Sequence, residues 1–258
     1  NAIKAAPQNA EARFLLGQAY LNVGQGAGAV KELEKARQYD YASEKLIPLL
    51  AQAYILQEEN SKVAVLESES EKNSVMAQTE FLAHLTHASL KLSKADDAKK
   101  ALAKAIRLDA NSVYTVLAKA YVAFADGDIE QANGGVTRVL KSQPDNINAI
   151  LLYGQIALAT EDYSLASEQF SRYAKLQPYS ILVHIYLADS YLKQQKHKEA
   201  NAEADILLKL NPNHGFANYV RAIAQYEEKE YQNALDAADK ALATKPTDVT
   251  LKIIAGAS

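Results

Sequence analysis

Apolar residues recur along the chain with a fixed period, and prolines mark that period. Pro144, Pro178, Pro212 and Pro246 stand 34 residues apart and close the phrases VLKSQP, YAKLQP, LLKLNP and ALATKP. The residues between the prolines suit helices throughout. A period of 34 with helix-compatible residues between its marks is typical of stacked helical hairpins. The pattern therefore predicts an all-α solenoid whose hairpins bury their apolar faces against one another.

Small and large apolar positions alternate within each period. Small residues such as Gly17 and Gly154 are expected where the two helices of a hairpin cross closely, and Tyr20, Phe170 and Tyr191 are expected to fill the space between successive hairpins. A proline then ends the second helix, because it cannot continue the hydrogen-bond ladder of the backbone. Polar residues after the proline, such as Asn146 and Asn213, are expected to cap the next helix.

The residues in this register resemble those of a known repeat family. After Pro7 they are Leu16, Gly17, Tyr20, Ala29, Leu33 and Ala36. This series is similar to the tetratricopeptide repeat (TPR), with the pattern W-x2-L-G-x2-Y, then A-x3-F, A and P. The resemblance implies a right-handed α-solenoid, a superhelix of about seven helix-turn-helix repeats in one array over residues 1–258. The repeats are predicted at 10–43, 44–78, 79–112, 113–146, 147–180, 181–214 and 215–248, with partial repeats at 1–9 and 249–258.

Two repeats depart from the pattern. The second has 35 residues and no closing proline, and its second helix, around SKVAVLESESEKN, is expected to be irregular or short. In the fourth, the motif residues arrive two places early, and a turn at 124–128 is expected to absorb the difference. The second helix of this repeat also contains Gly134 and Gly135, which cost about 1 kcal/mol each against alanine unless packing requires them.

Composition and charge narrow the class of protein. Hydrophobic residues make up 48% of the chain and charged residues 23%, which suits a continuous core. The net charge is −3, with 28 basic and 31 acidic residues interspersed, so we expect no nucleic-acid partner. No apolar run is long enough to cross a bilayer, so no membrane insertion is expected. Cysteine is absent, which suits an oxidising compartment and a cytosol equally.

The two ends of the sequence lack the polar capping repeats that close a solenoid. The first residues match the closing phrase of a repeat, and VTLKIIAGAS matches the opening of a further helix. We therefore expect a fragment of a longer protein.

Candidate catalytic and metal-binding groups are few. Glu80, His84 and His87 share one helix face and could supply metal ligands, but the expected interpretation is a polar patch on a solvent-facing helix. Asp126-Gly-Asp128 lacks the remaining ligands of a calcium loop, and residues 24–28 form a glycine-rich turn with no preceding strand. No nucleophile–base arrangement follows from the spacing. We therefore predict a protein that is not an enzyme and holds no metal or cofactor.

The TPR resemblance also implies where a protein or peptide partner would bind. In the family, repeat positions 2, 5, 9 and 12 of the first helices line the concave groove. Carried onto this chain, they give the candidate residues Phe14, Gln18, Gln52, His87, Leu151, Gln155, Ile185, Asp189, Phe216, Tyr219, Ile223 and Tyr226. This groove becomes apolar and aromatic toward the C-terminus, so it can bind an extended or helical peptide. The alternative is that further repeats cover it.

Phe14 and Gln18 stand where chaperone-binding TPR proteins carry a lysine and an asparagine that clamp a peptide carboxylate. Their identity argues against that class of adaptor. The oligomeric state stays open.

Several stretches resemble a narrower family. AEARFLLGQAYLNVGQ, the segment from Ile47 to Leu50 and the segment from Pro212 to Tyr219 are similar to long bacterial TPR lipoproteins of the PEP-CTERM protein-sorting and exopolysaccharide systems. This resemblance implies a periplasmic scaffold whose parent protein is a lipid-anchored outer-membrane protein. The alternative is a cytoplasmic TPR adaptor or regulator cut from a larger multidomain protein.

Overall fold

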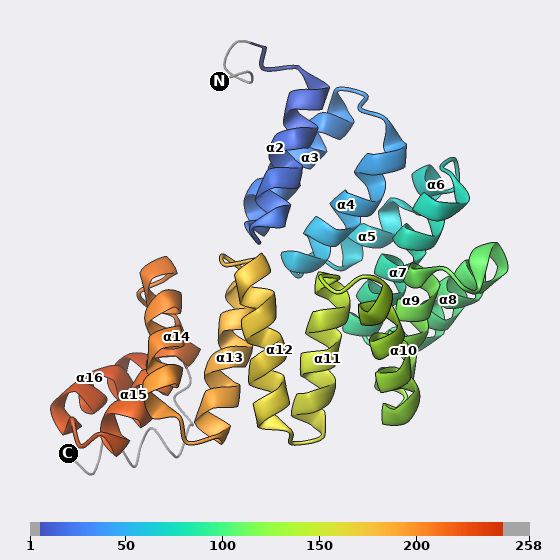
Figure 1. Ribbon diagram of the computed structural model, residues 1–258. Coiled ribbons are helices and arrows are strands. Elements are labelled where there is room, and N and C mark those ends of the chain that lie inside the picture. The colour runs from blue at the N-terminus through green and yellow to red at the C-terminus, as the bar shows by residue number, and fades with distance from the viewer. Residues whose placement is uncertain (1–5, 245–258) are drawn as a thin grey trace. The chain divides into compact units, whose positions relative to one another are not determined.

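The computed structural model describes residues 6–244, and these residues form helical hairpins joined by short turns, without a strand among them (Figure 1). The all-α TPR solenoid class predicted from the sequence is confirmed. The helices are α2 (Ala10–Asn22), α3 (Gly26–Gln38), α4 (Ser43–Leu56), α5 (Ser61–Val65), α6 (Glu67–Ser70), α7 (Val75–Lys91), α8 (Ala95–Asp109), α9 (Val113–Ala125), α10 (Ile129–Ser142), α11 (Ile147–Ala159), α12 (Tyr163–Leu176), α13 (Ile181–Lys193), α14 (His197–Leu210), α15 (Gly215–Glu227) and α16 (Tyr231–Leu242).

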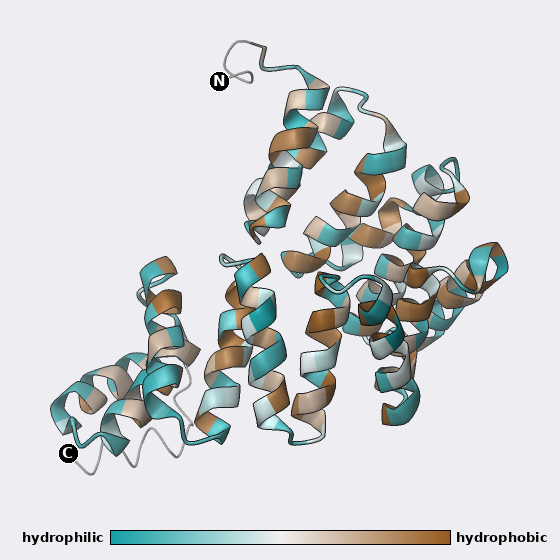
Figure 2. Ribbon diagram, viewed as in Figure 1, coloured by the Kyte–Doolittle hydropathy of each residue, from teal (hydrophilic) through white to brown (hydrophobic). Residues whose placement is uncertain are grey.

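The chain divides into two compact units. The described part of unit 1 is 6–152 together with 176–180, and that of unit 2 is 153–175 together with 181–244. Apart from the short α6, the helices carry both apolar and polar residues (Figure 2), as expected when hairpins bury one face against their neighbours and leave the other in water. The division leaves the prediction of a single array untested.

Close helix crossings occur at the small residues that the sequence pattern singled out. A Cβ atom on Gly17 would lie 2.7 Å from Cγ of Leu33 in α3, and one on Gly154 would lie 2.5 Å from the ring of Phe170 in α12. Any larger side chain would therefore force the Leu33 or Phe170 side chain out of its packed position. The Phe170 ring also stacks on Tyr186 of the following hairpin, with centroids 4.8 Å apart.

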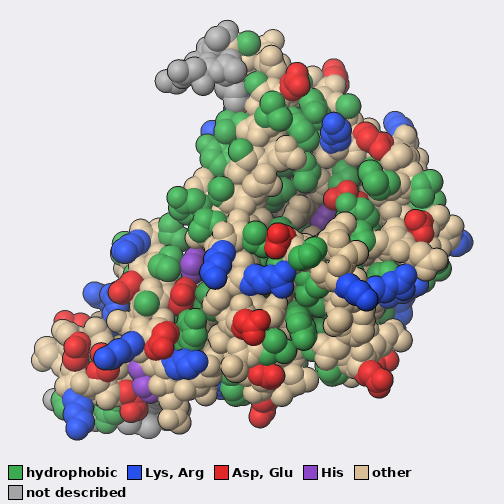
Figure 3. All heavy atoms as spheres, viewed as in Figure 1, with side chains coloured by type: hydrophobic (Ala, Val, Ile, Leu, Met, Phe, Trp, Pro, Cys, Tyr) green, Lys and Arg blue, Asp and Glu red, His purple; other side chains and the backbone are tan. Residues whose placement is uncertain are grey.

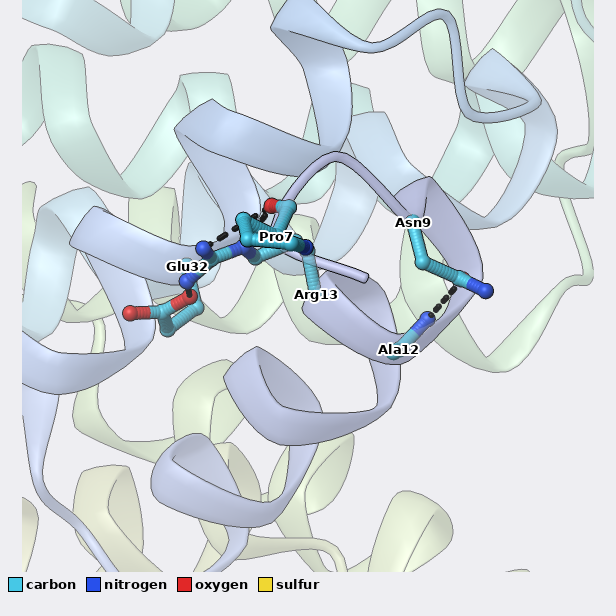
Figure 4. Close-up of polar contacts among 5 residues, drawn as sticks. All are labelled: Pro7, Asn9, Ala12, Arg13 and Glu32. Carbon is cyan, nitrogen blue, oxygen red and sulfur yellow. Dashed lines mark hydrogen bonds and ion pairs between the residues drawn. The ribbon is translucent and has the colours of Figure 1, made fainter. Parts of the chain in front are cut away.

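A buried ion pair holds the first hairpin together (Figure 4). Arg13 of α2 and Glu32 of α3 are 8% and 5% exposed, and Nη1 of Arg13 lies 2.5 Å from Oε2 of Glu32. Nε and Nη2 of Arg13 also donate to the Pro7 carbonyl, at 3.0 and 2.9 Å. Arg13 therefore ties the segment before α2 to both helices of the hairpin.

The second helix of repeat two is broken, as the sequence predicts. It consists of α5 and α6, which have five and four residues and meet at Leu66. Val63 and Leu66 are 0% and 1% exposed and anchor the two pieces to the core.

In repeat four, whose motif residues come two places early, the turn between α9 and α10 lies where the sequence predicts it. Gly127 has a φ of +82°, and the side chain of Asp128 caps α10 by accepting a hydrogen bond from the Gln131 N–H. A Cβ on Gly135 would lie 2.9 Å from Cβ of Ala120, so packing against α9 requires this glycine, whereas a Cβ on Gly134 would meet nothing.

The predicted helix ends are confirmed at three prolines. α10, α12 and α14 each end two residues before Pro144, Pro178 and Pro212, while Pro246 lies outside the described residues. Asn146 caps α11, as expected, through its side-chain oxygen.

The cap of α15 differs from the prediction. His214, and not Asn213, supplies it, with Nδ1 accepting from the Ala217 N–H at 3.2 Å.

One contact in unit 1 joins segments that are distant in sequence. Residues 176–180 lie against the turn between α2 and α3, where the Tyr179 N–H donates to the Val23 carbonyl and Nε2 of Gln177 to the Leu21 carbonyl. Gly24, with a φ of +82°, allows this approach, because a Cβ there would lie 2.9 Å from the Ser180 nitrogen. The predicted turn at 24–28 is shorter than expected, since α3 begins at Gly26.

Candidate functional site

The histidines of α7 lie inside unit 1. His84 and His87 are each 7% exposed, and the His87 ring stacks on Tyr121 of α9 with centroids 4.2 Å apart. The prediction of a polar patch on a solvent-facing helix is therefore wrong. α7 is enclosed because it packs against α4, α8 and α9, and only the assembled neighbours determine which face of a helix stays in water.

Burial sets the ionisation of this cluster. It lowers the pKa of His84 to about 4 and that of His87 to about 3, so both imidazoles are neutral near pH 7. Burial also raises the pKa of Glu80, against an opposing hydrogen bond from Tyr114. Among the described residues, no group of three or more acidic, histidine or cysteine side chains is placed to hold a metal ion.

The candidate groove positions of unit 1 are largely used for internal packing. Phe14 is 4% exposed and stacks on Tyr41, with centroids 4.2 Å apart, and Leu151 is 8% exposed. Phe14, Leu151 and His87 are therefore buried and are not exposed groove residues in this structure. Gln18 and Gln52 are half-buried.

The candidate positions of unit 2 all keep an accessible surface. We call them the unit 2 groove residues, namely Gln155 on α11, Ile185 and Asp189 on α13, and Phe216, Tyr219, Ile223 and Tyr226 on α15. Every one is half-buried. They occupy the first helices of three successive hairpins, at the positions that the repeat register assigns to one face.

Aromatic and aliphatic side chains dominate this set. Phe216 and Tyr219 lie with their ring centroids 6.2 Å apart, and Tyr226 meets Tyr231 edge to face at 5.6 Å. Ile185, Phe216 and Tyr219 pack onto the core between α13, α14 and α15, and Ile223 and Tyr226 pack onto the core between α15 and α16. The inner part of each side chain is therefore fixed while its outer part remains accessible.

Two polar side chains complete the set. Nε2 of Gln155 donates to the Tyr186 hydroxyl at 2.9 Å. Asp189 forms no hydrogen bond or ion pair within the described residues, and burial raises the pKa of its carboxyl while Lys193 lowers it. A half-buried carboxylate of this kind favours a cation brought by a ligand.

Sequence reasoning missed two contributors to this face. Tyr186 and Tyr231 contact Gln155 and Tyr226 through the hydroxyl and the ring, respectively. Neither occupies a repeat position assigned to the groove, so only the packing of adjacent hairpins identifies them.

The charged side chains visible in Figure 3 do not gather into a patch of one sign. Lys/Arg and Asp/Glu side chains are interspersed on the face that Figure 3 shows. Asp126, in the acidic turn beside Gly127, forms a surface ion pair with Lys99 at 3.0 Å. No helix within residues 6–244 combines the length and the apolar character needed to span a bilayer.

Comparisons with known families agree with the repeat pattern. A family model described as tetratricopeptide repeat matches residues 1–43 and 187–249. A second model, described as anaphase-promoting complex, cyclosome, subunit 3, matches residues 135–205. No curated protein sequence matches the chain.

Solved structures with the same fold include three repeat proteins. A MamA structure is 20% identical, with a TM-score of 0.55 over 65% of this chain and 97% of that chain. YrrB, described as a TPR protein with an unusual peptide-binding site, is 16% identical, with a TM-score of 0.56 over 76% and 98%. A chain of the Cut9–Hcn1 assembly is 14% identical, with a TM-score of 0.51. The match covers 93% of this chain and 54% of the chain in that assembly. With the repeat register and the helical hairpins, these matches show that the chain has the fold of tetratricopeptide-repeat proteins, and that the two segments at 1–43 and 187–249 match the repeat itself.

Proposed function

We propose that this chain is a non-catalytic scaffold that binds a peptide segment of a protein partner along the unit 2 groove residues. The TPR fold supports protein interaction as the general role. The observation that carries the finer proposal is the half-burial of all seven groove residues on α11, α13 and α15. A row of anchored but accessible aromatic side chains is what a peptide-binding surface requires.

The chemistry of the face defines the partner. Phe216, Tyr219 and Tyr226 offer large rigid surfaces for apolar side chains at low entropic cost. Asp189 offers an unpaired carboxylate, and a lysine or arginine of the peptide would favour its charged form. The partner segment is therefore apolar with at least one basic residue.

Replacing Tyr219 and Tyr226 together with alanine tests this site. Binding of the partners captured by the chain is expected to weaken at least tenfold, because buried aromatic anchors contribute about 2 kcal/mol or more each to a binding interface. Pull-down followed by titration of each captured partner measures the effect.

Tyr179→Ala is the matched control, because Tyr179 is an exposed tyrosine of unit 1 whose hydrogen bond to Val23 uses the backbone. It should leave the affinity unchanged. Circular dichroism of each variant confirms that the helices remain. Equal binding by the double variant and the native chain, for every captured partner, would refute the groove.

We further propose that the scaffold serves protein-sorting or exopolysaccharide machinery in a bacterial envelope. The similarity of AEARFLLGQAYLNVGQ and of the segment from Pro212 to Tyr219 to PEP-CTERM-associated TPR lipoproteins supports this setting. Fractionation of cells that express the full-length gene should then place the protein in the periplasm or at the outer membrane. Recovery in the cytoplasmic fraction would favour the alternative, a cytoplasmic adaptor cut from a multidomain protein.

A further inference from the structure

A cavity lies where α6, α7 and α8 meet in unit 1, and we call it the α6–α8 cavity. Its volume is about 220 Å³. It exists because the second helix of repeat two is broken, so the short α6 covers less of α7 than a full helix would. α6 and α8 are joined at this point by Lys104, which pairs with Glu67 at 2.7 Å and with Glu71 at 3.6 Å.

The walls of the α6–α8 cavity are mainly apolar. Phe81 and Leu82 of α7 are 0% and 5% exposed, and Leu108 of α8 closes the side at 36% exposed. An apolar cavity of about 150 Å³ is large enough to hold benzene. The α6–α8 cavity can therefore accept one aliphatic or aromatic side chain.

Two polar groups at this cavity have hydrogen-bonding capacity that the described residues do not use. Arg107 donates through Nε to the Ala103 carbonyl but forms no ion pair within the described residues. Ser70 is 2% exposed, and its hydroxyl forms no hydrogen bond within those residues. Lys104, by contrast, already pairs with both Glu67 and Glu71. The guanidinium of Arg107 is thus the cation at this cavity that is free to take a carboxylate, and the Ser70 hydroxyl can donate to the same ligand.

A second cavity shares two lining residues with the first. Glu67 and Lys104 also line a volume of about 350 Å³, together with Asn60 and Ser61 of the α4–α5 region. The side-chain oxygen of Asn60 is buried without a hydrogen-bond partner.

We infer that the α6–α8 cavity docks a second peptide segment, one that places an apolar side chain in the cavity and an adjacent acidic side chain on Arg107. This chemistry differs from that of the unit 2 groove residues, which favour a basic segment. Arg107 lies on α8, the second helix of its repeat, whereas the unit 2 groove residues all lie on first helices. The two surfaces allow the scaffold to hold two different segments.

Selection from a random heptapeptide library on the full chain tests this inference. Peptides with an apolar residue next to Asp or Glu are expected to be enriched. Arg107→Gln should weaken an enriched peptide at least tenfold, because a hydrogen bond between two charged groups is lost. Changing the acidic residue of the peptide to its amide should weaken binding by a similar factor, with little further loss when the two changes are combined. Fluorescence polarisation measures each affinity.

Three variants separate this site from the rest of the surface. Ser70→Leu should also weaken binding by filling the cavity. Arg138→Gln, which removes an exposed arginine of α10, should leave binding unchanged, as should Tyr219→Ala combined with Tyr226→Ala. If Ser70→Leu unfolds unit 1, the affinity of the Arg107→Gln variant decides the test. Absence of acidic peptides from the selection, or equal binding by Arg107→Gln, would overturn the inference. Peptides that depend on Tyr219 and Tyr226 but not on Arg107 would overturn it too, while leaving the proposed function intact.

Discussion

Replacing Glu32 with alanine is expected to lower the free energy of unfolding by about 3–5 kcal/mol, because it leaves the Arg13 guanidinium buried without its carboxylate. Arg13 is 8% exposed, and the Pro7 carbonyl satisfies only part of its donor set. Because a repeat array can unfold in stages, the effect should appear in the transition of unit 1. Urea denaturation followed by circular dichroism measures it.

Two further variants show whether burial causes this loss. Arg13→Met combined with Glu32→Leu replaces the pair by apolar side chains and should recover most of the stability. Glu69→Ala breaks the pair between Arg37 and Glu69, whose side chains are 36% and 33% exposed, and should cost less than about 1 kcal/mol. If Glu32→Ala cost no more than Glu69→Ala, the buried pair would not be the stabilising element of the first hairpin.

The helical hairpins could be predicted from the sequence because their causes are local. Pro144, Pro178 and Pro212 lack a backbone donor and disfavour helical geometry in the residue before them, and α10, α12 and α14 end two residues before them. Gly17 and Gly154 mark close crossings because no other residue leaves room there for Leu33 and Phe170. The irregular helix of repeat two was also predictable, since its charged and apolar residues do not keep helical spacing.

Parts of the site could not be predicted because they depend on what covers each face. The family register places Phe14, His87 and Leu151 in a groove, yet each is buried. Nothing in the sequence near α7 indicates that α4 and α9 will enclose it. The Gln177 side chain likewise reaches the Leu21 carbonyl across 156 positions, a separation that no local pattern reports. The repeat period therefore predicts the hairpins, and their packing decides which residues a partner can reach.

Two features of unit 1 lie at α7. A broken second helix opens the α6–α8 cavity on one side of α7. α7 also carries His84 and His87, which are buried, and the His87 ring stacks on Tyr121. Polar side chains buried in a helix that packs on several others make its stability depend on their protonation.

Unit 1 is expected to lose stability steeply as the pH falls below about 6.5. Burial lowers the pKa of His84 to about 4 and of His87 to about 3, from 6.5 in the unfolded chain. Above pH 6.5 both states are neutral at these residues, so stability is fully present. Below it the unfolded chain binds protons that the folded chain refuses, and stability falls until the folded pKa values are reached. At pH 5 the two histidines together should cost on the order of 3–4 kcal/mol.

Urea unfolding at pH 7.5, 6 and 5 checks this expectation against variants of the cluster. His84→Leu combined with His87→Phe keeps an apolar side chain beside Tyr121 and should abolish most of the loss between pH 7.5 and 5. Glu80→Gln should retain the loss, because the raised pKa of Glu80 makes the folded chain bind more protons and acts in the opposite direction. Equal acid sensitivity in the double variant and the native chain would mean that these imidazoles reach water. That result would also contradict the burial of α7 in unit 1, because the packing of His87 on Tyr121 is what lowers the pKa of the imidazole.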